Sequence, residues 1–566
     1  MAPTAPTTPT TPDVTVTVIV YNDAERLPRA VESLRRQTLR NIEIIISDDH
    51  STDNTPEVAK ALAAKDSRIV YNRLPHNSGG CSAPRNSAME IARAPFLMFL
   101  DSDDELPERA CEILLGELRS DDTVDFAMGG VERVRTDTGS VSYWHPHLFT
   151  ARRTVRGIRQ QPEMLFEHLS TNKMYRREFI DRHQLRFPEG IHYEDQLFSA
   201  QAYCLADAFT VVPDPVYRWY ISPFEAVGSL SISNQRHRIE NVRDRINVAR
   251  LIDDFLVDSG HEDIKADKDF KFLKHDLRMY TGDFPYRTTD WIKQFADEIS
   301  PYLATLTPEA FQRLPRDQRV VIQLMRSGRY EEAQLAARGM GRDVAPREIT
   351  EDGEGRVYWG PLVPADPQAA RELEVTDLDL HDRPFRTTML RHEITRIEPG
   401  TGSRITLAVR TYDPGAQLPM GPVVATIHLA PTEDHRLSTS FRLDPVRPGI
   451  FEGQAVLDLA AVPLPPHGFA GTRHPVLAIT QRGQHNTGLL LAPLEFPTMR
   501  KKIAYHHRLA EHMVTVEPEG HGAGRMRVVW ERAGLLAKGE PHLPAIGRIV
   551  GPSLKRVRGV VRGLVR

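Results

Sequence analysis

Apolar positions in the first part of the chain fall into short runs that alternate between two spacings. Short apolar runs that we interpret as strands cover residues 14–22, 41–49, 68–74 and 95–104, and the first of them is rich in β-branched residues. The segments between them carry apolar residues at helical spacing, at residues 26–38, 55–65 and 82–94. This alternation predicts βαβ units with right-handed crossovers, and hence an α/β domain with a mainly parallel, Rossmann-like sheet.

The pattern changes twice further along the chain. Residues 234–345 read mostly as helices, and a passage rich in Pro, Gly and acids follows them as a boundary. Short alternating runs separated by Gly, Pro and Asp then predict a β-sandwich-like domain. We therefore expect a disordered tail, an α/β domain, a helical linker region, a β-rich domain and a basic extension, over residues 1–13, 14–233, 234–345, 350–500 and 501–566.

Composition narrows the class of protein. The 566 residues are 40% hydrophobic and 26% charged, which is ordinary for globular domains, and the net charge of -4 does not suit a nucleic-acid binder. Cys81, Cys111 and Cys204 are too scattered for a disulfide framework or a zinc site, and they fit a reducing compartment. No apolar run reaches about 18 residues, the length of a membrane span. The Thr- and Pro-rich start lacks the features of a secretory signal, so we expect a cytoplasmic protein.

Polar clusters follow the first, second and fourth predicted strands, at Tyr21–Asn22, Asp48–Asp49 and Asp101–Asp104. The carboxyl ends of parallel strands meet at the edge of the sheet where ligands bind, so these clusters predict one site. The segment DSDDE places four carboxylates within five residues and calls for a counter-charge. A divalent cation such as Mg²⁺ or Mn²⁺ would supply it, and an acidic turn that caps the next helix is the alternative.

Three further segments each allow a functional and a structural interpretation. Asp49 could accept hydrogen bonds from a nucleotide or form an Asx-turn. The Gly79–Gly80 loop could present a helix start and Arg85 to a phosphate, or form a plain tight turn, and it matches neither a dinucleotide-binding motif nor a phosphate-binding P-loop. Glu194–Asp195 could supply a general base, or an acid pair that a helix dipole favours.

Taken together, the segments VIVYN, ESLRRQT, SDDHSTDNT, NSGGCSAPRN, FLDSDDELP and YEDQLF resemble the family 2 inverting glycosyltransferases with a GT-A fold, over about Val14 to Ser233. The resemblance implies a UDP-sugar donor and Mn²⁺ or Mg²⁺. It implies that Asp195 is the catalytic base with Glu194 beside it. It implies a metal site at Asp103, Asp101 and Asp104. The nucleotide-side residues that it implies are Val20, Tyr21, Asp49, Asn77, Arg85, Asp101, Arg218 and Trp219.

Two features are similar to the glycosyltransferases of wall teichoic acid polyol-phosphate chains: TNKMYRREFI followed by FPEGIHYEDQLF, and a helical region that leads to β modules. This likeness implies transfer to a hydroxyl of an anionic or lipid-linked cell-envelope polymer, and a homo-oligomer (a trimer) through the β modules. A capsule or exopolysaccharide transferase is one alternative. A non-catalytic carbohydrate-binding or assembly protein on a degenerate transferase fold is another.

The end of the chain, IGRIVGPSLKRVRGVVRGLVR, interleaves Arg and Lys with Val and Leu and contains no acid. It is either a solvated charged end or an amphipathic segment for an anionic surface. The second interpretation predicts peripheral contact with the inner face of the cell membrane.

Overall fold

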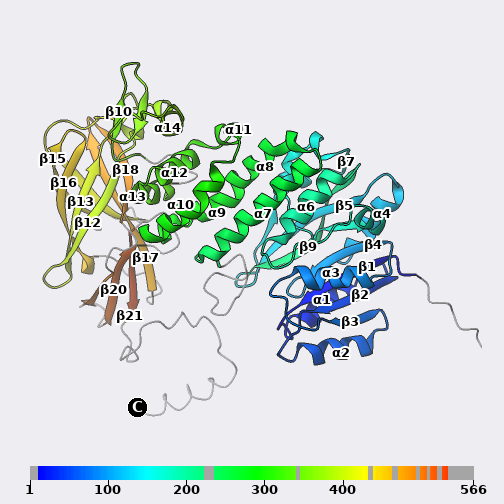
Figure 1. Cartoon of the computed structure of the whole chain (residues 1–566). Helices are drawn as coiled ribbons and strands as arrows, with labels where there is room; N and C mark the ends of the chain where they lie inside the picture. Colours follow the sequence, from blue (N-terminus) through cyan, green and yellow to red (C-terminus); the bar gives the residue numbers. More distant parts are fainter. Residues whose placement is uncertain are drawn as a thin grey trace, which may run out of the picture. The chain divides into compact units, whose positions relative to one another are not determined.

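The computed structural model describes residues 11–221, 235–339, 345–430, 438–461, 470–492, 498–505, 510–518 and 526–532. Contacts divide these residues into two compact units. The N-terminal unit comprises the described residues up to 339 together with Pro364–Val375, and the C-terminal unit comprises 345–363 and the described residues from Thr376 onward (Figure 1). Most of the tail and of the basic extension lies outside the described residues.

The first strands of the N-terminal unit form a parallel sheet in the order β3-β2-β1-β4. Their bounds are β1 (Val14–Val20), β2 (Ile42–Asp48), β3 (Ile69–Arg73) and β4 (Phe96–Asp101). The connecting helices are α1 (Leu27–Arg35), α2 (Thr55–Lys65), α3 (Ser82–Ile91) and α4 (Ala110–Ser120). Every residue of β1 and β2 is buried, as expected for a parallel sheet covered on both faces. The register sets Ile19 opposite both Ser47 and Asp101, which aligns the ends of β1, β2 and β4.

Beyond β4 the sheet is mixed and continues in the order β8-β5-β9-β7, with β6 on β5. These strands are β5 (Phe126–Arg135), β6 (Val141–Trp144), β7 (Arg153–Val155), β8 (Lys173–Arg176) and β9 (Phe209–Ile221). Helices α5 (Arg177–Arg182) and α6 (Glu194–Leu205) belong to this half. Gly129 lets β5 and β9 approach closely, since a Cβ there would lie 2.6 Å from Val216. Stacked and edge-on aromatic rings, including Phe99, Phe126 and Phe198, fill the core beside α6.

The predicted helical region is helical, and it belongs to the N-terminal unit. Its helices are α7 (Ile239–Asp258), α8 (Lys265–Lys271), a π-helical turn (Phe272–Leu277), α9 (Arg278–Thr281), α10 (Thr289–Leu303), α11 (Pro308–Gln312), α12 (Arg316–Arg326) and α13 (Tyr330–Ala337), with α14 (Pro367–Leu373) packed on α12. Helix α7 packs against α6 (Figure 1). Short 3-10 turns cover Pro146–Phe149, Ile158–Gln160, Pro162–Phe166, Glu262–Ile264 and Phe284–Tyr286.

The C-terminal unit is β-rich, as predicted. Its strands are β10 (Ile349–Glu351), β11 (Val357–Trp359), β12 (Arg391–Pro399), β13 (Arg404–Tyr412), β14 (Val423–Ala430), β15 (Ser438–Arg447), β16 (Ile450–Asp458), β17 (Ala470–Gln481), β18 (Gln484–Leu491), β19 (Met499–Tyr505), β20 (Ala510–Pro518) and β21 (Met526–Arg532). Short 3-10 turns cover Thr376–Leu378, Phe385–Thr387 and Leu459–Ala461.

Hydrogen bonding closes part of this β-rich unit into a ring. The ring runs β14-β15-β16-β13-β12-β18-β17 and returns to β14, and the first residues of β17 also pair with β21, which continues to β20 and β19. Along β13 the buried side chains alternate with less buried ones, which gives the ring an apolar interior that includes Ile405, Leu407 and Val409. Strands β19 to β21 lie where we expected the basic extension to begin. Among the described residues, no helix is long and apolar enough to cross a membrane.

Candidate active site

The loops after β1 and β2 are tied together at the carboxyl edge of the sheet. Val20 is buried, whereas Tyr21 beside it is 48% exposed. Asn22 has a φ of 47°, a left-handed conformation that Asn tolerates better than most residues. Its side-chain oxygen accepts a hydrogen bond from the backbone N–H of Thr52 at 2.8 Å. The first loop is therefore held in place and leaves the Tyr21 ring accessible.

Asp49 and Asn77, which we predicted on the nucleotide side of one site, are in contact. Asn77 Nδ2 donates to the Asp49 backbone oxygen at 3.0 Å and to Asp49 Oδ2 at 3.1 Å. Asp49 Oδ1 accepts from the backbone N–H of Ser78 at 2.9 Å. The neighbouring carboxylate holds the loop from within, because Asp48 Oδ1 accepts from the Ser51 backbone N–H at 2.8 Å. Asp48 thus fixes the turn and Asp49 joins the second loop to the third.

Arg85 links the end of β4 to the start of α6. Its guanidinium donates to Asp101 Oδ1 at 2.9 Å, to Glu194 Oε1 at 2.6 Å and to Asp195 Oδ1 at 3.0 Å. The residue is only 2% exposed. The structure therefore places Arg85 among carboxylates, whereas the family resemblance implied a position along the nucleotide.

Burial sets the protonation of this cluster. It raises the pKa of Asp101 to about 6, although Arg85 acts in the opposite direction. It raises the pKa of Glu194 to about 7, and repulsion from Asp195 adds to the effect. Near neutral pH the cluster of carboxylates can therefore contain one bound proton in addition to the positive guanidinium. Both limit the repulsion among the carboxylates.

The carboxylates after Asp101 point to different partners. Asp103 is 40% exposed at its side chain, and its Oδ2 accepts from Arg26 at 3.2 Å. Asp104 is 3% exposed, and its oxygens accept from the Tyr217 hydroxyl at 2.7 Å and from the Tyr220 backbone N–H at 2.8 Å. Asp104 is therefore turned inward and engaged by Tyr217 and Tyr220, and its role as a metal ligand stays a prediction.

Arg218 and Trp219 are engaged by other side chains of the sheet. Arg218 Nε donates to Glu132 at 2.9 Å, and a backbone bridge joins Arg218 to Glu105. The Trp219 ring lies edge-on to Trp144, with ring centroids 5.7 Å apart. These contacts place β9 beside the acidic segment. Among the described residues, neither the Arg218 nor the Trp219 side chain forms a hydrogen bond or ion pair with Asp101 or Asp195.

Asp195 occupies the first turn of α6, and both of its carboxylate oxygens have partners. Oδ1 accepts from Arg85, and Oδ2 accepts from the backbone N–H of Ser170 at 3.4 Å. The side chain remains 18% exposed. It is thus oriented on one side by a buried cation and on the other by a backbone amide, and it still reaches solvent.

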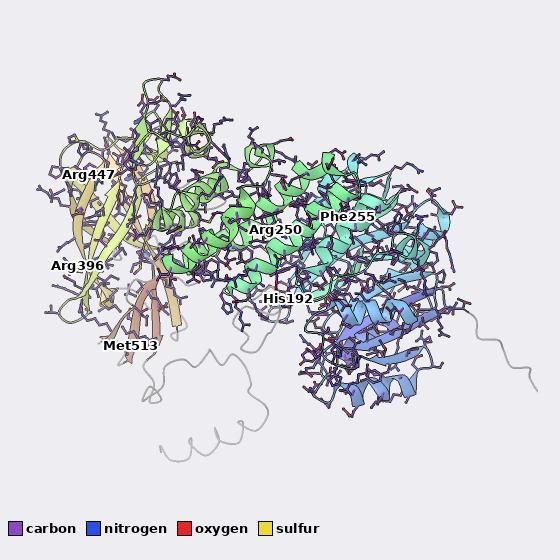
Figure 2. All side chains as sticks on the ribbon, in the orientation of Figure 1. His192, Arg250, Phe255, Arg396, Arg447 and Met513 are labelled. Atoms are coloured by element: carbon purple, nitrogen blue, oxygen red, sulfur yellow. The ribbon has the colours of Figure 1, made fainter. Side chains whose placement is uncertain are left out.

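Helix α7 and the π-helical turn hold the segment around Asp195. Figure 2 labels His192, which belongs to this segment. Tyr193 has a φ of 69°, and its hydroxyl donates to Asn241 Oδ1 at 2.8 Å. The Arg245 guanidinium lies 3.5 Å from the centre of the Tyr193 ring. Asp276 accepts from Gln196 at 3.2 Å and from Arg245 at 2.6 Å.

The sequence interpretation missed Ser170, Gln196, Arg245 and Asp276. Their roles come from contacts between residues far apart in the chain, such as Gln196 and Asp276, which are 80 positions apart. No periodicity or short motif reports such contacts. Arg245 and Asp276 are buried in the structure, and that burial also became known only with the fold.

The acidic segment fits a metal ion only in part. Within the described residues, no group of three or more His, Cys, Asp or Glu side chains forms a ready metal site. A Mg²⁺ ion at a nucleotide site usually takes one or two carboxylates, and phosphates and water complete its shell. Asp101 and Asp103 fit that requirement, because their side chains are 35% and 40% exposed.

The fold is an α/β domain with acidic side chains at the carboxyl edge of its parallel strands, where sheets of this kind bind ligands. Residues 15–183 match the family described as Glycosyl transferase family 2, and this part of the chain is therefore a family 2 glycosyltransferase domain. The matched range contains Asp49, Asp101 and Asp103 and ends before Asp195.

Relatives of known description match the same region. EpsH from Bacillus subtilis (strain 168) is 34% identical over 212 residues, which are 37% of this chain and 60% of EpsH. The poly(ribitol-phosphate) beta-N-acetylglucosaminyltransferase TarP from Staphylococcus aureus (strain N315) is 29% identical over 225 residues, which are 39% of this chain and 66% of TarP. The chain thus spans less than two thirds of the length of either relative.

The crystal structure of TarS from S. aureus is among the solved structures that the chain matches. The match has a TM-score of 0.48 and 16% sequence identity, and it covers 92% of this chain and 86% of that chain. TarS residues 1-349 in complex with UDP-GlcNAc match with a TM-score of 0.47 and 18% identity over 62% of this chain and 96% of that chain. The domain assignment rests on the family match.

Proposed function

We propose that the protein is an inverting glycosyltransferase that moves a sugar from a UDP-sugar to a hydroxyl group of an anionic cell-envelope polymer. One observation carries the proposal: Arg85 joins Asp101, on the predicted metal side, to Asp195, the predicted base, in one hydrogen-bonded cluster. The family 2 domain and the named substrate of TarP support it.

On the donor side, Asp49 and Asn77 form the nucleotide-binding edge, with Tyr21 exposed beside them. Asp101 and Asp103 are the residues that would hold Mn²⁺ or Mg²⁺. When bound, the cation supplies Lewis-acid stabilisation of the diphosphate leaving group. Arg85 and Arg26 hold the two carboxylates at the edge of the site.

On the acceptor side, Asp195 takes the proton of the attacking hydroxyl. General base catalysis of this kind contributes about 10²–10⁴-fold in rate. Arg85 and the Ser170 amide fix the carboxylate, so the orientation is established before the acceptor arrives. A single displacement at the anomeric carbon inverts its configuration and needs no nucleophile from the chain.

The test is a screen for UDP release with a panel of UDP-sugars and polyol-phosphate acceptors, with Mn²⁺, Mg²⁺ or a chelator. Asp195→Asn is expected to lower the rate about 10²–10⁴-fold and to leave UDP binding intact. The matched control is Asp297→Asn, an exposed carboxylate on α10, which is expected to behave as the wild type. Turnover that is absent with every donor, while UDP still binds, would favour a binding protein on a transferase fold.

Two further predictions concern the partners of the protein. They are the formation of an oligomer through the β-rich unit and contact with a membrane through the basic C-terminal segment, and both stay predictions. The segment with the interleaved Arg and Val residues lies outside the described residues.

A further inference from the structure

A fully buried ion pair lies beside Asp195, and the catalytic scheme above does not use it. Glu167 and Lys173 are both 0% exposed at their side chains, and Lys173 Nζ lies 3.7 Å from Glu167 Oε1. Such a pair is costly to bury, and apolar side chains of similar size often stabilise a fold as well or better. Stability alone is therefore a weak reason for this pair at this position.

The pair fixes the backbone of the turn between its two members. Glu167 Oε1 accepts from the Leu169 backbone N–H at 3.2 Å. Lys173 Nζ donates to the Leu169 backbone oxygen, and to Asn172 Oδ1 at 3.0 Å. Both polar groups of the Leu169 backbone are thus held by the two charged side chains, and the path of the turn depends on them.

Other side chains hold the same turn from the direction of the core. The Tyr203 hydroxyl donates to the Glu167 backbone oxygen at 2.9 Å. The Tyr175 hydroxyl donates to the Ser170 backbone oxygen at 3.4 Å. With the buried pair, these contacts leave the turn little freedom, although it has no regular secondary structure.

The turn presents one group to the site, the Ser170 backbone N–H that donates to Asp195 Oδ2. Ser170 is 0% exposed, so this contact is shielded from water. Electrostatics supports the arrangement. Burial lowers the pKa of Lys173 to about 8, and the carboxylates of Glu167 and Asp195 oppose that fall. Burial also raises the pKa of Glu167 to about 7, and the charge of Lys173 opposes that rise, so the two members of the pair stabilise each other's ionised form.

We propose that Glu167 and Lys173 are positioning residues for Asp195. They lock the turn of residues 167–173, so that the Ser170 amide holds the Asp195 carboxylate ready to accept a proton. The inference rests on the proposed function, because it assumes that Asp195 is the base.

The test variant is Glu167→Gln combined with Lys173→Met, which removes both charges and avoids leaving a lone buried charge. The turnover number per UDP-binding site is expected to fall about 10–100-fold, as for a small misplacement of a catalytic group. The KM for the donor is expected to stay within about twofold, since the donor edge is untouched. Counting UDP-binding sites by calorimetry removes any contribution from misfolded protein.

A double-mutant cycle with Asp195→Asn separates positioning from a general structural effect. If the pair acts through Asp195, its removal costs no further rate in the Asp195→Asn protein. If the rate loss from removing the pair and the rate loss from Asp195→Asn simply multiply in the combined protein, the proposal is overturned. The matched control is Lys268→Met with Asp269→Asn, a buried pair in α8 with an Nζ–Oδ1 distance of 3.4 Å, which is expected to leave the rate per site unchanged.

Hydrogen exchange gives a readout that needs no activity. Peptides that cover residues 167–173 are expected to exchange faster in the Glu167→Gln/Lys173→Met protein, with the other described strands unchanged. Unchanged exchange in the turn would overturn the proposal even if the rate fell. If the wild type transfers no sugar at all, the proposed function fails, whereas the exchange result still reports on the turn.

Discussion

Replacement of Arg85 by Met tests whether one buried cation holds the site together. At an effective dielectric constant of about 20, each pair of charges about 4 Å apart interacts by about 4 kcal/mol before desolvation. Loss of one partner of a buried ion pair typically costs about 3–5 kcal/mol, because the remaining charge is left uncompensated. Arg85 faces Asp101, Glu194 and Asp195, so the cost would be higher if all of them stayed ionised.

Protonation limits the cost and makes it depend on pH. Burial raises the pKa of Glu194 to about 7, above its ordinary value of 4.5. A carboxyl group with a raised folded pKa binds its proton more tightly in the folded state, so its stabilising contribution is complete below about 4.5 and is lost as the pH rises through about 7. Loss of Arg85 raises this pKa further. The deficit of Arg85→Met is therefore expected to be small at pH 5 and largest at pH 8, with about 3 kcal/mol lost near neutral pH.

Thermal unfolding at both pH values measures this deficit. The N-terminal unit, which carries Arg85, comprises Met1–Asp343 and Pro364–Val375. In a unit of that size a loss of about 3 kcal/mol corresponds to a fall of about 4 °C in Tm, at about 2.1 cal/mol/K of unfolding entropy per residue. Glu194→Gln in the Arg85→Met background is expected to recover at least half of that fall, because it removes one of the uncompensated charges. Arg250→Met, an exposed arginine on α7 that Figure 2 labels, is the matched control. A deficit that is the same at both pH values, or larger at the lower one, would refute the reasoning.

Other substitutions test single contacts at the same edge of the sheet. Asp49→Ala is expected to weaken UDP binding at least about tenfold, measured by calorimetry, because Asn77 loses a charge-assisted hydrogen bond and the nucleotide edge loses its shape. Asp103→Asn is expected to raise the Mn²⁺ concentration needed for half-maximal activity and to leave Tm unchanged. Asp104→Asn is expected to lower Tm by about 1–4 °C, since a buried polar group left without its partner costs about 1–3 kcal/mol. Equal Tm values for these two variants would contradict the inward orientation of Asp104 and its bond with Tyr217.

The strands of the first half were predictable because parallel strands carry an uninterrupted apolar signal. β1 and β2 are buried along their whole length, so their β-branched runs had few polar positions to obscure them. Parallel strands also end at a common edge, which is why polar residues after β1, β2 and β4 could be assigned to one site before any contact was known. The contact between Asp49 and Asn77 fits that assignment.

The partners of the acidic segment were not predictable in the same way. Arg85 lies 16 positions from Asp101 but 109 from Glu194, and only the fold brings the two carboxylates to one guanidinium. Arg26 reaches Asp103 across 77 positions. The chain itself thus supplies counter-charges for carboxylates that we expected to need a cation. Clustered acids alone are therefore weak grounds for a metal, and the metal proposal depends on the family resemblance and on the exposure of Asp101 and Asp103.

The helical region also contacts the segment that carries Asp195, the base that we propose, and it does so more closely than a linker would. Tyr193 keeps a left-handed backbone, which costs an ordinary residue about 1 kcal/mol or more and persists only where its surroundings enforce it. Asn241 and Arg245 of α7 provide that enforcement through the Tyr193 hydroxyl and ring. Asp276 fixes the neighbouring Gln196 from the π-helical turn, a kind of helix irregularity that is frequent at functional sites. The segment that carries Asp195 is thus shaped by residues that follow it by about 45 to 80 positions. If Asp195 is the base, as we propose, the catalytic unit extends through α7 and the π-helical turn, well past the end of the family match at residue 183.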